Sequence, residues 1–360
     1  MPTISLCMIV KNEEKTLQRC LVSVQDIADE IIIVDTGSTD KTRDIARDFT
    51  EKIYNFKWIN DFAAARNYSY DQATMDYILW LDADDVILPA DWNKLIELKD
   101  SLDPSVDIVM LKYNAAFDDQ GNVILSYMRE RLSKRSGKYR WQEPVHEYLL
   151  AVGNTILADI CVTHLREHSS APGRNLTIYE NLILQGRELT PRGLYYYARE
   201  LKDNEKYVTA IEYFNKFLDS GLGWVEDNIN ACHELSRCYD AIGDYKKSLV
   251  SMLKSFEYDT PRAEICCQLG YHFKAVENYA QALFWFELAT KLKKPKNCWG
   301  FIQDDYWGFI PNIELCVCYF KLGNIEEAVK CNNKAAEYKP QDPAVIYNKQ
   351  YFERLTAIPD

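Results

Sequence analysis

The stretch from 77 to 89 constrains the fold most, because an apolar run leads directly into a cluster of carboxylates. Residues 77–81 are mostly apolar, which is typical of a strand in a parallel sheet whose two faces are both covered. Asp82, Asp84 and Asp85 follow at once. Open α/β sheets bind ligands at the carboxyl ends of their strands. We therefore expect these carboxylates at the edge of a cleft.

Three carboxylates so close in sequence repel one another unless a cation lies among them. Mg²⁺ and Mn²⁺ prefer oxygen ligands and in turn hold the phosphates of a substrate. A lone Asp-x-Asp is more often a solvated acidic turn before a helix. The position of this cluster after a buried strand, and the motifs on either side of it, favour the metal site.

Strands and helices alternate along the first part of the chain. Residues 4–10 and 30–34 are short apolar strands, and Asn12 offers a cap for a helix after the first of them. A helix over about 41–50 follows the second strand, and another is capped near Asp61. This alternation predicts an α/β domain with a doubly wound, mostly parallel sheet and right-handed crossovers.

Two further side chains fall where a ligand could reach them. Asp35 ends its strand as Asp82 ends the later one, and a carboxylate there can accept hydrogen bonds from a nucleobase or a ribose. Capping of its own turn is an equal alternative. Arg66 lies in a stretch of small residues and could contact a phosphate as a fixed cation. The ordinary alternative is an exposed helical arginine.

The segment 129–147 is the most basic part of the chain, and it also carries a His-Glu pair. Positive charge after an acidic cluster suits a nucleoside diphosphate. A strand over 158–163 places His164 at its end. The loop 166–174, which contains proline and glycine, is a candidate lid, and an inert loop is equally plausible.

From about residue 175 the pattern becomes helical and repeats. Small and large residues recur at matching offsets in each segment, and the step from 245 to 279 equals the tetratricopeptide period. The other two steps need insertions, notably the aromatic segment 298–307. Solenoids of this kind present a concave face to peptides or proteins. A scaffold or dimerisation role is an equal alternative. The four segments align on Tyr207, Tyr245, Tyr279 and Ile325.

The length of 360 residues indicates two domains, which we place at 1–174 and 175–360. A net charge of -12 argues against nucleic acid as a partner. No apolar run is long enough to span a membrane, and no signal peptide is visible. The 11 cysteines show no paired framework, which favours free thiols in a reducing compartment. We therefore expect a cytoplasmic protein.

With these motifs placed, residues 3–165 resemble the family 2 glycosyltransferases, which have a GT-A fold. The resemblance lies in segments 5–13, 33–40, 65–67 and 81–85. It implies inverting transfer from a nucleotide sugar, with UDP-glucose or UDP-N-acetylglucosamine as the expected donor and Mn²⁺ or Mg²⁺ as the cofactor. The metal ligands that we expect are Asp84, His146 and His164. The residues expected to contact the nucleotide sugar are Val10, Asn12, Asp35, Arg66, Asp82, Ala83 and Arg131.

The later motif 141–147, together with the trailing repeats, resembles a bacterial subgroup. That subgroup includes enzymes that glycosylate cysteine or serine in bacteriocin peptides, and some cell-surface glycan enzymes. The resemblance implies a peptide or protein acceptor, and the helical domain could also form a homodimer. The chain departs from the better-known members, whose base is the Asp of a Glu-Asp pair. We expect Glu147 as the general base, with Glu143 second.

Three other functions remain open from the sequence. The protein could transfer sugar to a cell-surface glycan. It could also be a non-catalytic tetratricopeptide adaptor that binds a nucleotide sugar, although the intact acidic cluster and Arg66 weigh against this. A nucleotidyltransferase is disfavoured, because no glycine-rich phosphate loop opens a helix near the N-terminus.

Overall fold

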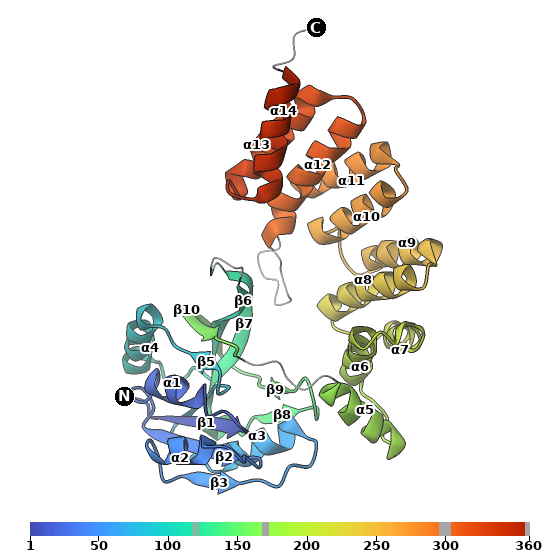
Figure 1. Cartoon of the computed structure of the whole chain (residues 1–360). Helices are drawn as coiled ribbons and strands as arrows, with labels where there is room; N and C mark the ends of the chain where they lie inside the picture. Colours follow the sequence, from blue (N-terminus) through green and yellow to red (C-terminus); the bar gives the residue numbers. More distant parts are fainter. Residues whose placement is uncertain (118–120, 122, 168–172, 295–303, 357–360) are drawn as a thin grey trace. The chain divides into compact units, whose positions relative to one another are not determined.

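The computed structural model describes residues 1–117, 121, 123–167, 173–294 and 304–356 (Figure 1). The chain divides into two compact units, Met1–Leu189 and Thr190–Asp360. Helix α5 (Arg174–Leu184) therefore lies in the first unit, whereas the sequence suggested a boundary at 174. The candidate lid at 166–174 and the insertion at 298–307 fall largely outside the described residues.

The first unit is built on one eight-stranded sheet with the order β3-β2-β1-β4-β7-β6-β10-β5. Strand β1 is parallel to β2 and β4, and β2 is parallel to β3, as the sequence predicts. Strand β7 is antiparallel to both β4 and β6, so the sheet as a whole is mixed. The strands are β1 (Ile4–Val10), β2 (Glu30–Asp35), β3 (Ile53–Asn55), β4 (Tyr77–Trp80), β5 (Asp85–Val86), β6 (Ile108–Phe117), β7 (Val123–Lys134) and β10 (Thr155–His164).

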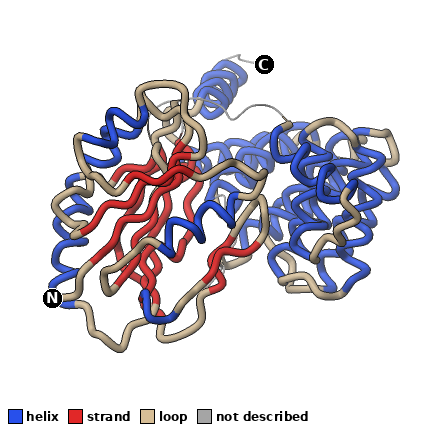
Figure 2. Tube along the Cα trace, turned by 90° about the horizontal axis from the view of Figure 1, so that it is seen from below, coloured by secondary structure: helices blue, strands red, loops and turns tan. Residues whose placement is uncertain are grey.

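Both faces of the sheet are covered, as Figure 2 shows for the helices. On one face, side chains of β1 such as Leu6 and Met8 share a core with those of the covering helices, including Leu21 and Leu95. On the other face, Cys7 belongs to a second core with Ala63 and Trp141. The first face is covered by α1 (Leu17–Val22), α2 (Thr42–Arg47) and α4 (Pro89–Ser101), and the second by α3 (Phe62–Asp71) and the ribbon of β8 (Arg140–Gln142) and β9 (Tyr148–Leu150).

The loop after β1 differs from the prediction. Helix α1 begins at Leu17, and Asn12 has a φ of 57°, so Asn12 does not cap it. Its side-chain oxygen instead accepts a hydrogen bond from the Thr39 N–H at 2.8 Å, and its own N–H donates to the Ser38 hydroxyl at 3.0 Å. Asn12 therefore ties the loop after β1 to the loop after β2. Asp61 caps α3 as predicted, because its carboxylate accepts from the Ala64 N–H.

The second unit consists of helix pairs stacked in sequence order (Figure 1). The four residues on which the repeat was aligned are the first residues of α7, α9, α11 and α13, so the predicted register is confirmed. The helices are α6 (Pro191–Asp203), α7 (Tyr207–Ser220), α8 (Val225–Ala241), α9 (Tyr245–Lys254), α10 (Ala263–Ala275), α11 (Tyr279–Lys291), α12 (Phe309–Lys321), α13 (Ile325–Tyr338) and α14 (Pro343–Thr356), with short 3₁₀ turns at Ser255–Glu257 and Asp304–Trp307.

The matching offsets of the repeat are helix-packing positions. The small residue in the first turn of each second helix is fully buried, and the larger residues that follow it are buried as well. Between paired helices the chain passes through a residue with positive φ, which is glycine in two of the four turns. The residues at these positions therefore pack the helices together, and we assign them no role in a reaction. The small residues are Ala210, Ser248, Ala282 and Ala328.

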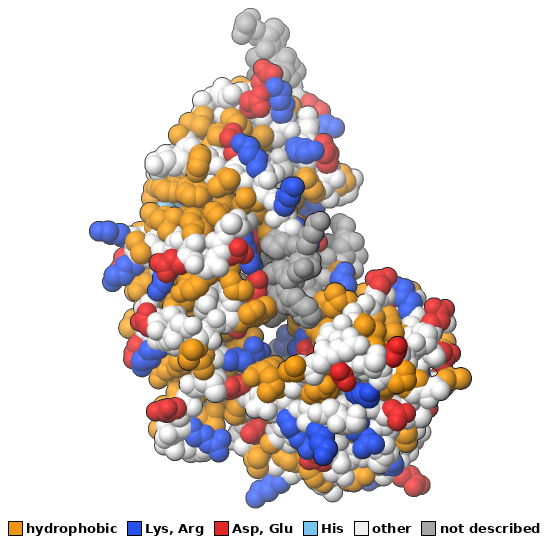
Figure 3. Space-filling view, turned by 180° about the vertical axis from the view of Figure 1, so that it is seen from behind, with side chains coloured by type: hydrophobic (Ala, Val, Ile, Leu, Met, Phe, Trp, Pro, Cys, Tyr) orange, Lys and Arg blue, Asp and Glu red, His pale blue; other side chains and the backbone are white. Residues whose placement is uncertain are grey.

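The cysteines in the described part of the chain are free thiols, and all of them except Cys161 and Cys331 are buried. Among the described residues, no helix is both long and apolar enough to cross a membrane. On the face of the molecule in Figure 3, acidic and basic side chains are interspersed. A cytoplasmic location remains a prediction.

Candidate active site

A cleft of about 660 Å³ opens in the first unit, beside the carboxyl ends of β1 and β4. This is where ligands bind in open α/β sheets. The cleft brings together residues that are far apart in the sequence, because their strands are neighbours in the sheet. The predicted site residues that line it are Val10, Asn12, Arg66, Asp82, Ala83, Asp84, His146, Glu147 and His164.

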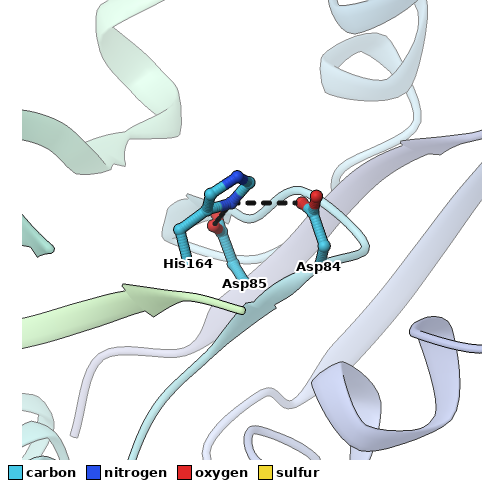
Figure 4. Close-up of side chains that lie close together, drawn as sticks. All are labelled: Asp84, Asp85 and His164. Atoms are coloured by element: carbon cyan, nitrogen blue, oxygen red, sulfur yellow. Dashed lines mark ion pairs between the residues drawn. The ribbon is translucent and has the colours of Figure 1, made fainter. Parts of the chain in front are cut away.

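One group at the cleft could hold a metal ion. It consists of Asp84, Asp85 and His164, which can offer ligand atoms that all lie within 4.8 Å of one another. Strand β5 begins at Asp85 and pairs with the end of β10, so that His164 lies opposite Asp85. The His164 Nδ1 atom is 3.5 Å from an oxygen of each carboxylate, and Figure 4 shows the three side chains converging.

Two atoms of this group support its use as a cation site. Asp85 Oδ1 and His164 Nδ1 are buried and have no hydrogen-bond partner in the described structure. Buried polar atoms normally have partners, and those without one call for an explanation such as a bound ion. Carboxylate oxygens suit Mg²⁺ and Mn²⁺. The residues present therefore fit the divalent cation that the resemblance implied.

Burial and charge set the ionisation of these groups. Burial raises the pKa of Asp84, although the adjacent His164 lowers it. The pKa of His164 is raised, chiefly by its contact with Asp85. Burial also raises the pKa of Asp82, but the nearby Arg66 and Arg131 outweigh this effect and hold that pKa at about 2. Asp82 is therefore ionised near neutral pH, whereas burial disfavours the charged form of Asp84 and His164 offsets only part of this effect.

Arg66 joins two sides of the cleft. Its Nη2 donates to Asp82 Oδ1 at 2.7 Å, and its Nε donates to Glu147 Oε1 at 2.8 Å. The guanidinium also lies over the rings of Trp80 and Trp141, at 4.9 and 4.8 Å from their centroids. Its side chain is only 9% exposed. Arg66 therefore fixes the orientation of the two carboxylates, and its contact with a phosphate remains a prediction.

Three predicted residues do not line the cleft. Asp35 accepts a hydrogen bond from the Ser38 N–H at 3.0 Å, which is the turn-capping alternative. Arg131 is fully buried beside Asp85, so a direct contact of Arg131 with a diphosphate was a wrong expectation. Glu143 has a φ of 71° and stands outside the cleft. His146 does line the cleft, but it is not in the cation group.

The loop that carries His146 and Glu147 has an unusual backbone. His146 has a φ of 54°, and Glu143 also adopts positive φ. Residues other than glycine seldom adopt this conformation, and such strain is often found at functional sites. The carbonyl of Pro144 accepts a hydrogen bond from the Phe62 N–H at 2.8 Å, so the start of α3 holds the loop in place.

Several residues of the site were missed in the sequence. Asp85 was recognised as part of the acidic cluster but was not assigned as a metal ligand. Trp58 and Phe62 form an aromatic pair at the cleft, with centroids 4.7 Å apart, and Arg174 lies over the Phe62 ring. No motif marks these three residues, and Arg174 comes from the stretch next to the expected domain boundary.

Comparison with known proteins agrees with this geometry. Residues 5–156 match the model of glycosyl transferase family 2. The first unit is a family 2 glycosyltransferase domain. Residues 317–342 match the tetratricopeptide repeat, which agrees with the helix pairs of the second unit. The fold predicted from the sequence, a GT-A domain followed by tetratricopeptide-like helices, is thereby confirmed.

Two relatives match much of the chain. A TPR repeat-containing protein of Synechococcus elongatus is 29% identical over 277 residues, which cover 77% of this chain and 62% of that protein. The SPbeta prophage-derived glycosyltransferase SunS of Bacillus subtilis is 31% identical over 232 residues, which cover 61% of this chain and 54% of SunS. The chain thus spans between 54% and 62% of the length of these relatives.

Among solved structures, similarity is found to tetratricopeptide proteins. MamA has a TM-score of 0.38 at 17% identity, covering 46% of this chain and 88% of MamA. YrrB, described as a TPR protein with an unusual peptide-binding site, has a TM-score of 0.37 at 20% identity, covering 49% of this chain and 82% of YrrB.

Proposed function

We propose that this protein transfers a sugar from UDP-glucose or UDP-N-acetylglucosamine to a side chain of a peptide or protein, with inversion at the sugar. The observation that carries the proposal is the grouping of Asp82, Asp84 and Glu147 around one cleft of a family 2 glycosyltransferase domain. Carboxylates in such a cleft serve metal binding, sugar binding and proton transfer, which are the needs of this reaction.

The donor half of the cleft would bind the nucleotide sugar. Asp84, Asp85 and His164 would hold Mn²⁺ or Mg²⁺, which supplies positive charge to the leaving diphosphate. Asp82, kept ionised by Arg66, is suited to accept hydrogen bonds from ribose hydroxyls. Val10, Asn12 and Ala83 line the same cleft, where they would contact the nucleotide.

Glu147 is our candidate for the general base. Arg66 occupies its Oε1 atom and fixes the plane of the carboxylate. The second oxygen, Oε2, can then accept the proton that the acceptor nucleophile loses as it attacks the sugar. A general base must be held within hydrogen-bond distance of that proton, and the pair with Arg66 provides such a constraint. His146, in the same loop, is suited to contact the diphosphate.

The repeat unit supports a polypeptide acceptor. Tetratricopeptide solenoids offer extended surfaces to peptides and proteins. The second helices of the pairs also expose apolar side chains, among them Val208, Val250 and Phe284. In the proposed function these side chains would contact the polypeptide. A homodimer through this unit is the alternative use of the same surface.

The test is a transfer assay with the full chain. The protein is incubated with each UDP sugar, Mn²⁺ and a peptide library, and products are identified by mass spectrometry. We expect a peptide that gains the mass of one hexose or N-acetylhexosamine, and no product when EDTA removes the metal. Metal-dependent binding of a UDP sugar without hydrolysis or transfer would favour the non-catalytic adaptor. Transfer to saccharides or lipids alone would refute the polypeptide acceptor.

A further inference from the structure

Arg131 is a fully buried arginine next to the candidate cation site, and the proposed reaction leaves it without a role. Its Nη1 atom donates to Asp85 Oδ2 at 2.8 Å and to the carbonyl of Trp80 at 3.2 Å. The guanidinium lies between two aromatic rings, 3.8 Å from the centroid of Trp80 and 4.5 Å from that of Tyr113. Arg131 therefore contacts the cluster from inside the protein rather than from the cleft.

An irregularity in the sheet gives Arg131 this position. Strand β7 pairs Leu132 with Val109 of β6 and then Glu130 with Met110, so Arg131 is an extra residue in β7. Such a bulge leaves one residue out of the ladder and redirects its side chain, and bulges are frequent next to active sites. The bulge here directs a charged side chain to Asp85.

Stability alone is a weak explanation for this arrangement. The Nε and Nη2 atoms of Arg131 are buried without a hydrogen-bond partner in the described structure. Removing a charge from water is costly, and buried ion pairs often stabilise no better than well-packed apolar residues. Two nitrogens of Arg131 have no hydrogen-bond partner. Its effect on the position of Asp85 therefore explains its burial better than stability does.

The two oxygens of Asp85 have different surroundings because Arg131 contacts only one of them. Oδ2 accepts hydrogen bonds from Arg131 and from the Asp82 N–H at 3.0 Å. Oδ1 has no hydrogen-bond partner and lies 3.5 Å from His164 Nδ1. We propose that Arg131 is a positioning residue that holds Asp85 with Oδ1 directed at the divalent cation shared with Asp84 and His164. This inference rests on the cation site of the proposed function.

The test measures Mn²⁺ binding rather than catalysis. Binding to the full chain is titrated by the electron paramagnetic resonance signal of free Mn²⁺, for wild type, Arg131→Lys and Arg131→Met. Residues that orient metal ligands typically contribute about 10- to 100-fold to metal affinity. We expect a loss of that size in Arg131→Met and a smaller loss in Arg131→Lys, because lysine keeps the charge but has no planar fork. Circular dichroism establishes that each variant is folded.

Arg262→Lys is the matched control, because Arg262 is also buried and paired, but with Glu226 of the repeat unit. Its Mn²⁺ affinity should equal that of wild type. If Arg131→Met does not fold, Arg131→Lys decides the question. Folded Arg131 variants that bind Mn²⁺ within twofold of wild type would overturn the inference and leave the proposed function standing. A wild-type protein that binds no Mn²⁺ would refute the cation site and this inference together.

Discussion

Arg262 and Arg131 are both buried arginines paired with a carboxylate, yet their surroundings differ. Arg262 donates through Nη1 and Nη2 to the two oxygens of Glu226, at 2.5 and 2.8 Å, and also contacts Asp259. Arg131 donates through Nη1 alone, and one oxygen of its partner Asp85 has no hydrogen-bond partner. In the Arg262–Glu226 pair both carboxylate oxygens accept hydrogen bonds, and the pair joins α8 to the start of α10. In the Arg131–Asp85 pair one carboxylate oxygen accepts none and lies at the candidate cation site.

The same contrast holds for the two units more widely. In the repeat unit, the positions that recur are small and aromatic side chains in helix contacts. In the first unit, buried polar atoms without partners gather where β5, β6, β7 and β10 meet, at Asp85, Asn114, Arg131, Thr163 and His164. Unpaired buried groups are costly. The repeat unit also has such atoms, at His233, Glu264 and Trp307, but these residues lie on three separate elements. The concentration at one place in the first unit indicates chemistry there, whereas the recurring positions of the repeat unit indicate packing.

The largest effect that we predict is on packing in the repeat unit. Phe286 is 0% exposed and packs against Tyr271, so Phe286→Ala should lower the free energy of unfolding by about 3–5 kcal/mol. Phe284 on the same helix is 59% exposed, so Phe284→Ala should change the free energy of unfolding by no more than about 0.5 kcal/mol. Urea unfolding followed by circular dichroism measures both. Equal losses would mean that the outer face of α11 is packed as well.

Glu147→Gln tests whether the cleft of the first unit supplies the general base of the reaction. We expect sugar transfer to fall by about 10²-fold or more, because glutamine cannot accept the proton, while binding of the UDP sugar stays close to wild type. Glu143→Gln is the control, since Glu143 lies outside the cleft. Product formation by mass spectrometry gives the rates. Full transfer by Glu147→Gln, with loss in Glu143→Gln, would move the role of base to Glu143. A thiol acceptor, already partly ionised near neutrality, should reduce the loss of transfer in Glu147→Gln.

A buried carboxyl in the repeat unit should make its stability depend on pH. Burial raises the pKa of Glu264 from 4.5 to about 7. Between these values the unfolded chain loses the proton and the folded chain keeps it, so stability should fall as pH rises from about 4.5 to 7. The Glu264→Gln variant has no such carboxyl, so it should be more stable than wild type by about 3 kcal/mol at pH 8, but not at pH 4. Urea unfolding at both pH values measures the difference, and an equal difference at the two pH values would contradict the assignment.

The smallest effect concerns one hydrogen bond within the repeat. Ser236 and Ser248 are buried and their hydroxyl oxygens are 2.9 Å apart, where the other repeats have alanine in place of Ser248. Ser248→Ala leaves the Ser236 hydroxyl unpaired and should cost about 1–2 kcal/mol. The double variant Ser236→Ala/Ser248→Ala should recover most of this loss, because no unpaired group remains. Additive losses in urea unfolding would show that the hydroxyls do not depend on each other.

The sequence predicted the repeat unit well because its information is local. The spacing of small and aromatic residues follows the helix period, and it placed the first residues of α7, α9, α11 and α13. The strands that end at Val10, Asp35 and Trp80 were predictable for the same reason, since buried parallel strands are continuous apolar runs. The acidic cluster after β4 then identified the edge of the sheet where the cleft lies.

The details of the site depend on contacts that no local pattern shows. The pairing of His164 with Asp85 follows from the register of β10 and β5, so the sequence assigned His146 as a ligand and omitted Asp85. Arg66 and Glu147 are 81 positions apart in the chain. The bulge at Arg131 depends on the pairing of β7 with β6, and nothing in the sequence separates it from a surface arginine.

Donor binding by the full chain tests the central claim most directly. Isothermal titration calorimetry with UDP-glucose and UDP-N-acetylglucosamine, with and without Mn²⁺, compares wild type with Asp84→Asn and with Asp44→Asn, a control at an exposed position outside the cleft. We predict that Mn²⁺ strengthens binding of at least one donor to wild type and to Asp44→Asn, and that this strengthening is lost in folded Asp84→Asn. Equal affinity and equal metal dependence in wild type and Asp84→Asn would contradict the metal-dependent site at the end of β4.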